Sequence, residues 1–474
     1  MKKLKLFVEN FLVYGLGGII SKIIPLIMVP IVTRLMPNSD YYGISDLSNT
    51  VVSFGSALAV MGMYDAMYRM FFEKDDEQYK KRICSTALCF TMATSLIVSF
   101  IMLLAKDYIA QYFFSDRQYA YVVYLSAMAT LVGATNNIIS APTRMQNKRK
   151  IFLVTNTISP LLSYSISIPM LLAGHYVIAL PLAAVISGVT MEVAFGIMNR
   201  EWFDPRQLDF TLLKELLVIA IPLLPNFLIY WIFNSCDKIM VTNMVGIGAA
   251  GIYSVGSKLG NASQLIYTAF AGGWQYFAFS TMKDSDQVES TSNIFEYLGI
   301  VSFVCTTFVF ALAHPIYQFL FAGEYVSGYI VSPYLFLAPL LQMLFQVACN
   351  QFLVVKKTWP NMLILSGGAI ANVGINYYLI PTLGIEGAAI ATLAGYVISD
   401  IVGVIVLQKM KLLRIQPRFA AASGIMLIYI LIWRLIAKDS VCVSFMAAVL
   451  VSLLMVLLYR RDLTNLLARL KGKK

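Results

Sequence analysis

The stretch KKRICSTALCFTMATSLIVSFIMLLAK, residues 80–106, decides the fold class. Its central part, residues 83–105, contains no charged side chain, whereas basic residues stand at both of its ends. A run of about 20 apolar residues can cross the hydrocarbon core of a bilayer as a helix. Polar residues do not alternate with apolar ones, as they do in the strands of a membrane barrel. The stretch therefore predicts a transmembrane α-helix.

Similar apolar runs recur along the whole chain, which has 474 residues, of which 59% are hydrophobic and only 13% are charged. Soluble domains contain about 25% charged residues, so this chain must turn much of its surface to lipid. The prediction is an all-α integral membrane protein with about fourteen transmembrane helices. We expect these spans at roughly 11–35, 43–68, 83–105, 119–143, 151–173, 176–198, 215–243, 247–274, 292–313, 326–354, 359–381, 385–408, 417–437 and 441–459.

The distribution of Lys and Arg predicts the orientation of the chain in the membrane. Cytoplasmic loops collect basic residues, and most of the 36 Lys and Arg residues fall in alternate segments between the predicted spans. We therefore expect both termini in the cytoplasm. The net charge of +11 follows from the same rule. Because the basic residues are dispersed over many loops, we expect no nucleic acid as a partner.

The chain also contains two similar halves. Tyr42-Gly-Ile-Ser-Asp46 in the first half corresponds to Ala250-Gly-Ile-Tyr-Ser254 in the second. Internal repeats in a membrane protein are typical of transporters whose site lies between the halves, although a chance likeness of loops stays the alternative. We expect an N-terminal six-helix bundle over residues 1–200, a cytoplasmic linker over 201–210, a C-terminal six-helix bundle over 211–410, and two additional helices with a basic tail over 411–474.

Ionisable residues inside the predicted spans are the candidates for a functional site. Each costs about 2.5–3.5 kcal/mol in a bilayer, so such residues usually face a cavity or a partner. Asp65 and Arg69 are four apart and can pair on one helical face. Three lysines without three matching buried acids leave a positive surplus, which indicates a cavity for an anionic group. Internal pairing that only holds helices together is the alternative. The five deepest residues are Lys22, Asp65, Asp237, Lys238 and Lys258.

Polar residues and prolines point to the same helices. In the eighth span, polar residues recur at spacings of three and four, which predicts one polar face turned to a wet cavity. Prolines interrupt corresponding spans of the two halves, the first at Pro25 and Pro30 and the seventh at Pro222 and Pro225. The polar face comprises Tyr253, Ser257, Asn261, Gln264 and Thr268.

Signs of catalysis are few in the sequence. No G-x-x-x-x-G-K-[ST] motif occurs, so ATP does not drive transport directly. Asp284-Ser-Asp286 has a form used by some metal-dependent sugar transferases, but its short loop favours a solvated acidic segment. The six cysteines form no C-x-x-C pair. We therefore expect no enzyme, no cofactor and no metal site.

Several segments between about Asn10 and Leu407 resemble one family. The most specific is Ile380-Pro-Thr-Leu-Gly-Ile-Glu-Gly-Ala-Ala-Ile-Ala-Thr392. With the other segments, the chain resembles the bacterial polysaccharide flippases of the Wzx type. These belong to the superfamily of multidrug, oligosaccharidyl-lipid and polysaccharide exporters. The other segments are Gly15 to Lys22 with Pro25, Thr33-Arg-Leu, Tyr42-Gly43, Asp65 to Arg69 with Phe71-Phe-Glu73, Asp237-Lys238, Gly251-Ile-Tyr-Ser254 with Lys258, and Asn372 to Asn376.

The resemblance implies a structure and a substrate. It implies two pseudo-symmetric six-helix bundles around a V-shaped central cavity. The implied activity is the flipping of a polyprenyl-pyrophosphate-linked oligosaccharide across the bacterial cytoplasmic (inner) membrane for cell-surface polysaccharide, such as lipopolysaccharide. Membrane lipid surrounds the chain, and a polysaccharide polymerase and glycosyltransferases are the implied partners. The family pattern gives the substrate-binding positions as Lys22, Arg34, Arg69, Lys238 and Lys258.

Coupling to an ion gradient is plausible for this family, with Asp65 and Asp237 as the candidate residues. Two alternatives stay open. A cation-coupled multidrug exporter of the same superfamily is expected to have an acidic cavity. A membrane-embedded glycosyltransferase or polymerase is expected to need an acidic or metal site in a loop.

Overall fold

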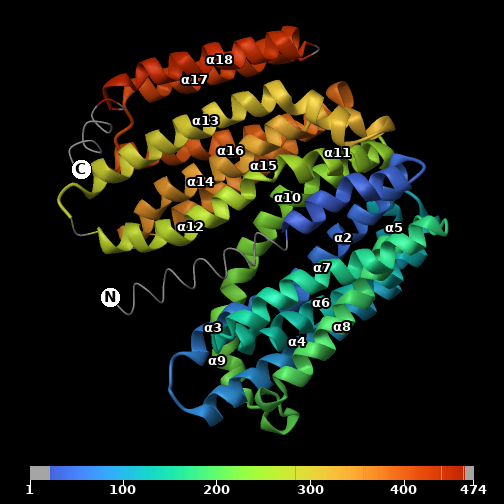
Figure 1. The fold of residues 1–474 in the computed structure, drawn as a ribbon. Coiled ribbons are helices and arrows are strands. Elements are labelled where there is room, and N and C mark those ends of the chain that lie inside the picture. Colours follow the sequence, from blue (N-terminus) through green and yellow to red (C-terminus); the bar gives the residue numbers. More distant parts are fainter. Residues whose placement is uncertain are drawn as a thin grey trace. The chain divides into compact units, whose positions relative to one another are not determined.

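The structure is a computed structural model that describes residues 22–282, 284–355, 357, 359–438, 440–462 and 464. Every regular element in these residues is a helix (Figure 1). In this part of the chain, eleven helices are long and apolar enough to cross a membrane, and a bent pair of helices makes twelve. The predicted all-α, multi-pass membrane fold is confirmed.

The two remaining predicted spans differ from single complete helices. Of the first, residues 11–21 lie outside the described residues, and residues 22–35 are helical. The eighth is broken, because two residues, Asn261 and Ala262, separate α11 (Ile247–Gly260) from α12 (Ser263–Ser280). The predicted polar face at 253–268 therefore does not lie on one continuous helix.

The chain packs as two compact units. The first comprises Met1–Ser254 with Tyr377–Ile385, and the second comprises Val255–Asn376 with Glu386–Lys474. The predicted linker at 201–210 stays a prediction. The first unit contains α2 (Ser39–Val60), α3 (Met63–Phe71), α4 (Glu77–Leu104), α5 (Lys106–Phe114), η1 (Arg117–Tyr119), α6 (Ala120–Met145), α7 (Arg149–Leu172), α8 (Ala179–Met198), η2 (Arg200–Trp202), η3 (Pro205–Gln207), α9 (Phe210–Ala220), η4 (Ile221–Leu223), α10 (Leu224–Met244) and the first half of α11.

The second predicted span bends by 47° between α2 and α3. The bend lies at Met61 and Gly62, which both have positive φ angles, of 49° and 76°. A Cβ atom at Gly62 would lie 2.7 Å from the carbonyl oxygen of Ala220 in α9. Glycine adopts this backbone conformation at low cost and leaves room for the neighbouring helix. The bend thus depends on glycine and not on proline.

The prolines act differently in the two corresponding spans. Pro222 lies in the 3₁₀ turn η4 and Pro225 in the first turn of α10, so the predicted interruption of the seventh span is confirmed. The helical residues 22–35 run through Pro25 and Pro30 without a break. The predicted interruption of the first span is therefore wrong in the described part of that helix.

The second unit contains the remaining helices. They are the rest of α11 from Val255, α12, α13 (Gln287–Leu320), η5 (Gly323–Ile330), α14 (Ser332–Val354), α15 (Trp359–Leu383) as far as Asn376, α16 (Ile385–Lys409) from Glu386, α17 (Pro417–Ile432), the π-helix η6 (Trp433–Ala437) and α18 (Val441–Leu458). A row of small residues in α16 is buried, and such rows allow membrane helices to pack closely; it comprises Gly387, Ala391, Gly395 and Ser399.

Buried acidic residues anchor the last two helices to this unit. Glu386 in α16 accepts hydrogen bonds from Tyr334 Oη at 2.9 Å and from Arg434 Nε at 2.8 Å. Glu296 in α13 accepts hydrogen bonds from the backbone N–H of Gln416 at 2.7 Å and from Tyr459 Oη at 3.0 Å. Charge-assisted hydrogen bonds are roughly twice as strong as neutral ones, so these contacts fix α17 and α18 on α13 and α16.

Candidate functional site

The two repeat motifs meet at a close contact between α2 and the start of α11. A Cβ atom at Gly43 would lie 2.4 Å from the carbonyl oxygen of Ile247, and one at Gly251 would lie 2.1 Å from that of Ser39. No side chain fits at such distances, so both positions require glycine in this arrangement. Gly43 and Gly251 are equivalent positions of the repeat, and small residues are what allow membrane helices to approach closely.

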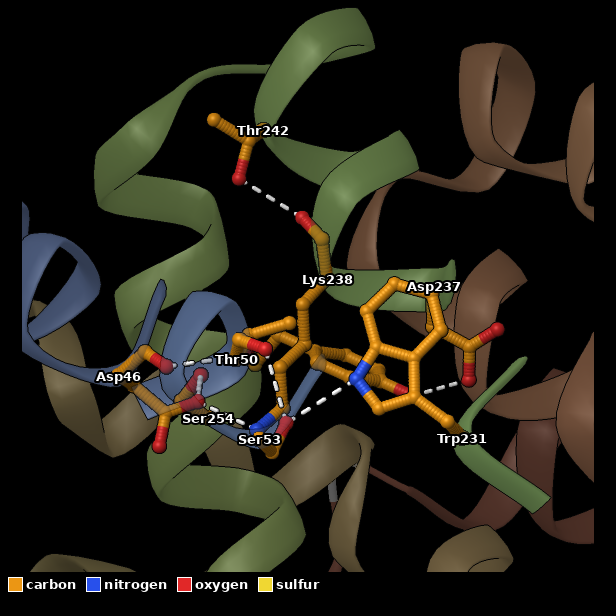
Figure 2. A network of polar contacts seen from close by, with 9 residues as sticks. Asp46, Thr50, Ser53, Trp231, Asp237, Lys238, Thr242 and Ser254 are labelled. Atoms are coloured by element: carbon orange, nitrogen blue, oxygen red, sulfur yellow. Dashed lines mark hydrogen bonds and ion pairs between the residues drawn. The ribbon is translucent and has the colours of Figure 1, made fainter. Parts of the chain in front are cut away.

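An ion pair lies three residues beyond these glycines. Asp46 in α2 pairs with Lys238 in α10, and Ser254 Oγ in α11 donates a hydrogen bond to Asp46 Oδ2 at 2.8 Å (Figure 2). The Asp46 side chain is 5% exposed and the Lys238 side chain 16%. Asp46 and Ser254 are again equivalent positions of the repeat. One carboxylate thus joins three helices inside the apolar spans.

Hydroxyl groups extend this network along α2. The indole Nε1 of Trp231 in α10 donates to Ser53 Oγ at 3.0 Å, and Ser53 donates to the carbonyl oxygen of Thr50 at 2.8 Å. Thr50 Oγ1 donates to the carbonyl oxygen of Asp46 at 3.0 Å, which closes the chain of contacts (Figure 2). Such satisfied chains of hydrogen bonds hold buried polar groups in one geometry.

Asp237 lies next to Lys238 but has different partners. Its Oδ2 accepts a hydrogen bond from Tyr253 Oη in α11 at 2.8 Å, and its Oδ1 accepts one from Cys236 Sγ at 3.4 Å. The residue is only 2% exposed. The two neighbours therefore point to different sides of α10, and they connect α10 to α11 and to α2.

The ion pair of Lys238 reduces the surplus of positive charge that the sequence predicts inside the spans. Its ammonium has a buried carboxylate partner in Asp46, a residue of the second predicted span that is absent from the five candidate ionisable residues. The predicted surplus of buried lysines is therefore wrong for Lys238. Removing one member of such a pair would leave an uncompensated charge, which costs about 3–5 kcal/mol when the site is buried.

The other predicted cationic residues are exposed. Lys22 and Arg34 lie on the helical residues 22–35, Lys258 lies in the last turn of α11, and all three are exposed. Asp65 and Arg69 lie on the short helix α3 and are also exposed. The structure shows no ion pair between Asp65 and Arg69 in this described helix, so their predicted pairing is wrong.

The predicted polar face of the eighth span divides into two parts. Tyr253 and Ser257 in α11 are buried, at 3% and 5% exposed. Asn261 lies in the break between α11 and α12 and is exposed, whereas Gln264 in α12 is half-buried. Tyr253 contacts the acidic network described above through its hydrogen bond to Asp237.

Asp46 is the site residue that sequence reasoning missed. The motif Tyr42-Gly-Ile-Ser-Asp46 serves in the sequence only as a sign of the repeat, and its aspartate is absent from the five ionisable residues expected deepest in the spans. Two signals point to it. The residue lies three positions after Gly43, as Ser254 does after Gly251, and Lys238 inside a span requires an acidic partner.

Comparison with known proteins supports this membrane architecture. Residues 31–329 match the profile of the family described as "Polysaccharide biosynthesis protein". The chain belongs to this polysaccharide biosynthesis family. The match includes α2, α10 and α11, which carry the ion pair. No curated protein matches the chain in sequence.

Solved transporter structures share the fold of this polysaccharide biosynthesis protein. The lipid II flippase MurJ in an inward closed conformation is 14% identical, with a TM-score of 0.69, over 96% of this chain and 100% of that chain. An inward-facing MATE multidrug resistance transporter of the MOP superfamily is 14% identical, with a TM-score of 0.60, over 83% and 98%. The predicted polysaccharide family is therefore confirmed by the profile match, and these structures show the fold alone.

A third structure concerns the polarity of a binding pocket. It is a MOP superfamily transporter from Pyrococcus furiosus, 13% identical, with a TM-score of 0.57, over 86% of this chain and 95% of that chain. For that transporter, a reverse polarity of the binding pocket is described as suggesting a different function. At this level of identity, these three similarities establish the fold and not the substrate.

Proposed function

We propose that this chain is a flippase that moves a polyprenyl-pyrophosphate-linked oligosaccharide across the bacterial cytoplasmic membrane by alternating access. Its family membership supports a role in polysaccharide biosynthesis. Its fold, shared with the lipid II flippase MurJ and with MATE transporters, supports transport. The headgroup would cross through the protein while the polyprenyl tail stays in lipid.

One observation carries the substrate class. Lys22, Arg34 and Lys258 lie on helical segments of predicted spans, yet their side chains are exposed. A cation in hydrocarbon is costly, so charged residues on membrane spans usually face polar surroundings or an anionic partner. A pyrophosphate headgroup is such a ligand, and Lys and Arg are the usual protein partners of phosphate. We infer that these residues, with Arg69, attract and hold the pyrophosphate, whereas the Lys238 ammonium is already paired with Asp46.

The remaining parts of the proposal concern coupling and location. Asp237 is the better of the two candidates for ion coupling, because it is buried on α10 beside the ion pair, whereas Asp65 is exposed on α3.

Both termini are proposed to lie in the cytoplasm, since basic residues dominate the alternate loops. Glycosyltransferases and a polysaccharide polymerase would supply and consume the substrate, and the chain itself would catalyse no covalent step.

The test measures where the lipid-linked oligosaccharide accumulates in cells that depend on this protein. Lys22→Ala and Lys258→Ala should each cause it to accumulate on the inner leaflet, because the proposed substrate site loses a charge that attracts pyrophosphate. Lys258→Arg keeps the charge and should retain most of the activity. Lys409→Ala is the matched control, since Lys409 is exposed at the end of α16. Unchanged flipping in both alanine variants would contradict the proposal that Lys22 and Lys258 hold the pyrophosphate.

A multidrug exporter is the second candidate, favoured by the MATE similarity and by the buried carboxylate of Asp237. It predicts that loss of the protein sensitises cells to cationic drugs and leaves the lipid-linked oligosaccharide unchanged. A sugar transferase is less favoured. Asp284 and Asp286 are exposed in the segment between α12 and α13, and Asp286 accepts a hydrogen bond from Ser290 at 3.2 Å.

A further inference from the structure

A polar cavity of about 530 Å³ lies among α6, α7 and α8 of the first unit. These three helices pack side by side (Figure 1). The volume falls in the range of about 300–1,000 Å³ that is typical of small-molecule sites. The cavity is separate from the network on α2, α10 and α11, because none of the network residues lines it.

The polar residues of α7 explain why the cavity exists. Thr155, Asn156, Ser159 and Ser163 all line it and fall on one helical face. On the same helix, Ser165 does not line it and is exposed. A transmembrane helix turns polar side chains away from lipid, so this face indicates a polar interior.

Several polar groups in the cavity still have capacity for hydrogen bonds. Asn136 Oδ1 in α6 is buried and has no hydrogen-bond partner among the described residues. The Asn156 amide donates to the carbonyl oxygen of Phe152 at 2.8 Å, which leaves its own oxygen as an acceptor. A buried polar atom without a partner costs about 1–3 kcal/mol, so a ligand or water that bonds to it is favoured.

One cation marks the end of the cavity near the last turn of α6. Arg144 is the one ionisable residue among the described lining residues. Its Nη1 donates to Tyr64 Oη at 3.1 Å, and its guanidinium lies 5.3 Å from the ring centroid of Phe152. A guanidinium has five N–H donors, so Arg144 keeps donors for an anionic group after the bond to Tyr64.

Together, the groups that line the cavity favour a ligand with hydroxyl groups, an apolar ring face and a negative charge. Hydroxyl and amide groups suit the hydroxyls of a sugar, Phe152 and Phe195 offer apolar walls to its ring, and Arg144 suits a carboxylate. A hydrocarbon tail would leave the buried Asn136 Oδ1 without a partner, and a cationic drug would meet Arg144. We propose that this cavity binds an acidic sugar residue of the transported oligosaccharide. The proposal rests on the flippase function above and extends it by naming the part of the substrate that binds here.

The test measures binding to the purified full chain in detergent, without transport. The probes are D-glucuronic acid, D-glucose and a short-chain phosphatidylglycerol, and the readout is the apparent affinity. Glucuronic acid should bind more tightly than glucose. Arg144→Gln should weaken glucuronic acid about tenfold, as expected for the loss of one charge-assisted hydrogen bond, and should leave glucose little changed. Arg144→Lys should recover part of the difference.

A pair of serine variants shows whether binding occurs in this cavity. Ser163→Trp fills it and should abolish binding of both sugars, whereas Ser165→Trp, two residues away and outside it, should not. Sugar binding that survives Ser163→Trp would overturn the proposal. Tighter binding of phosphatidylglycerol that Ser163→Trp removes would overturn it in favour of a lipid headgroup. If glucuronic acid binds as expected but the lipid-linked oligosaccharide is not flipped, the flippase proposal fails and the sugar site stands.

Discussion

The ion pair between Asp46 and Lys238 allows a quantitative prediction about stability. Both side chains lie inside the spans, at 5% and 16% exposed. Asp46→Ala leaves the Lys238 ammonium without this carboxylate, and it also removes the acceptor of the Ser254 hydroxyl. Breaking a buried pair costs about 3–5 kcal/mol. A hydrogen bond to a charged group is worth about 1.5–3 kcal/mol. We expect Asp46→Ala to lower the free energy of unfolding by about 3–5 kcal/mol and Ser254→Ala by less.

Replacing both members of the pair distinguishes the contribution of their charges to stability from the contribution of side-chain packing. Asp46→Leu with Lys238→Met removes both charges and keeps similar volumes, and such exchanges are often neutral or stabilising. The double variant should therefore regain most of the loss, apart from the hydrogen bond of Ser254. The assay is unfolding of the purified protein in a denaturing detergent, followed by a thiol-reactive dye on the buried Cys84 and Cys349. If the double variant were less stable than both Asp46→Leu alone and Lys238→Met alone, the assignment of a buried, mutually compensating pair would be refuted.

Three further predictions follow from other contacts. Gly251→Val should lower the thermal unfolding temperature and the flipping rate, because its Cβ would collide with the carbonyl oxygen of Ser39; wild-type values for both would contradict the close contact of α2 and α11. Asp400→Leu should raise the unfolding temperature, because both carboxylate oxygens are buried without a hydrogen-bond partner among the described residues and the side chain lines an apolar cavity. A lower temperature would show that Asp400 has a stabilising partner. Arg434→Ala should cost about 3–5 kcal/mol by leaving Glu386 buried without its cation, and a double variant with Glu386→Gln should recover part of this in the same unfolding assay.

Most of the membrane architecture could be predicted from the sequence, because a bilayer restricts a spanning segment to an apolar helix. The predicted spans correspond in order to the observed helices, and the turn at Pro222 was expected because proline cannot donate the helical hydrogen bond. The break at Asn261 was missed. The pair Gly260-Asn261 is a turn signal, but the apolar residues on both sides of it favoured one long helix.

The bend between α2 and α3 could not be predicted in this way. It depends on the contact of Gly62 with the carbonyl oxygen of Ala220, and that residue lies far away in the sequence. The partner of Lys238 presented a similar difficulty. A single sequence shows that a buried lysine needs an acid, but the choice of Asp46 depends on the packing of α2 against α10.

The flipping assay in reconstituted vesicles tests the central claim most directly. Purified protein would be placed in vesicles with a polyprenyl-pyrophosphate-linked oligosaccharide in one leaflet, and an enzyme outside the vesicles would report when the sugar becomes accessible. We predict accessibility that requires the protein and that falls strongly with Lys22→Ala and Lys258→Ala, while Lys409→Ala keeps the wild-type rate. Equal rates in vesicles with and without the protein would contradict the claim that this chain translocates a lipid-linked oligosaccharide.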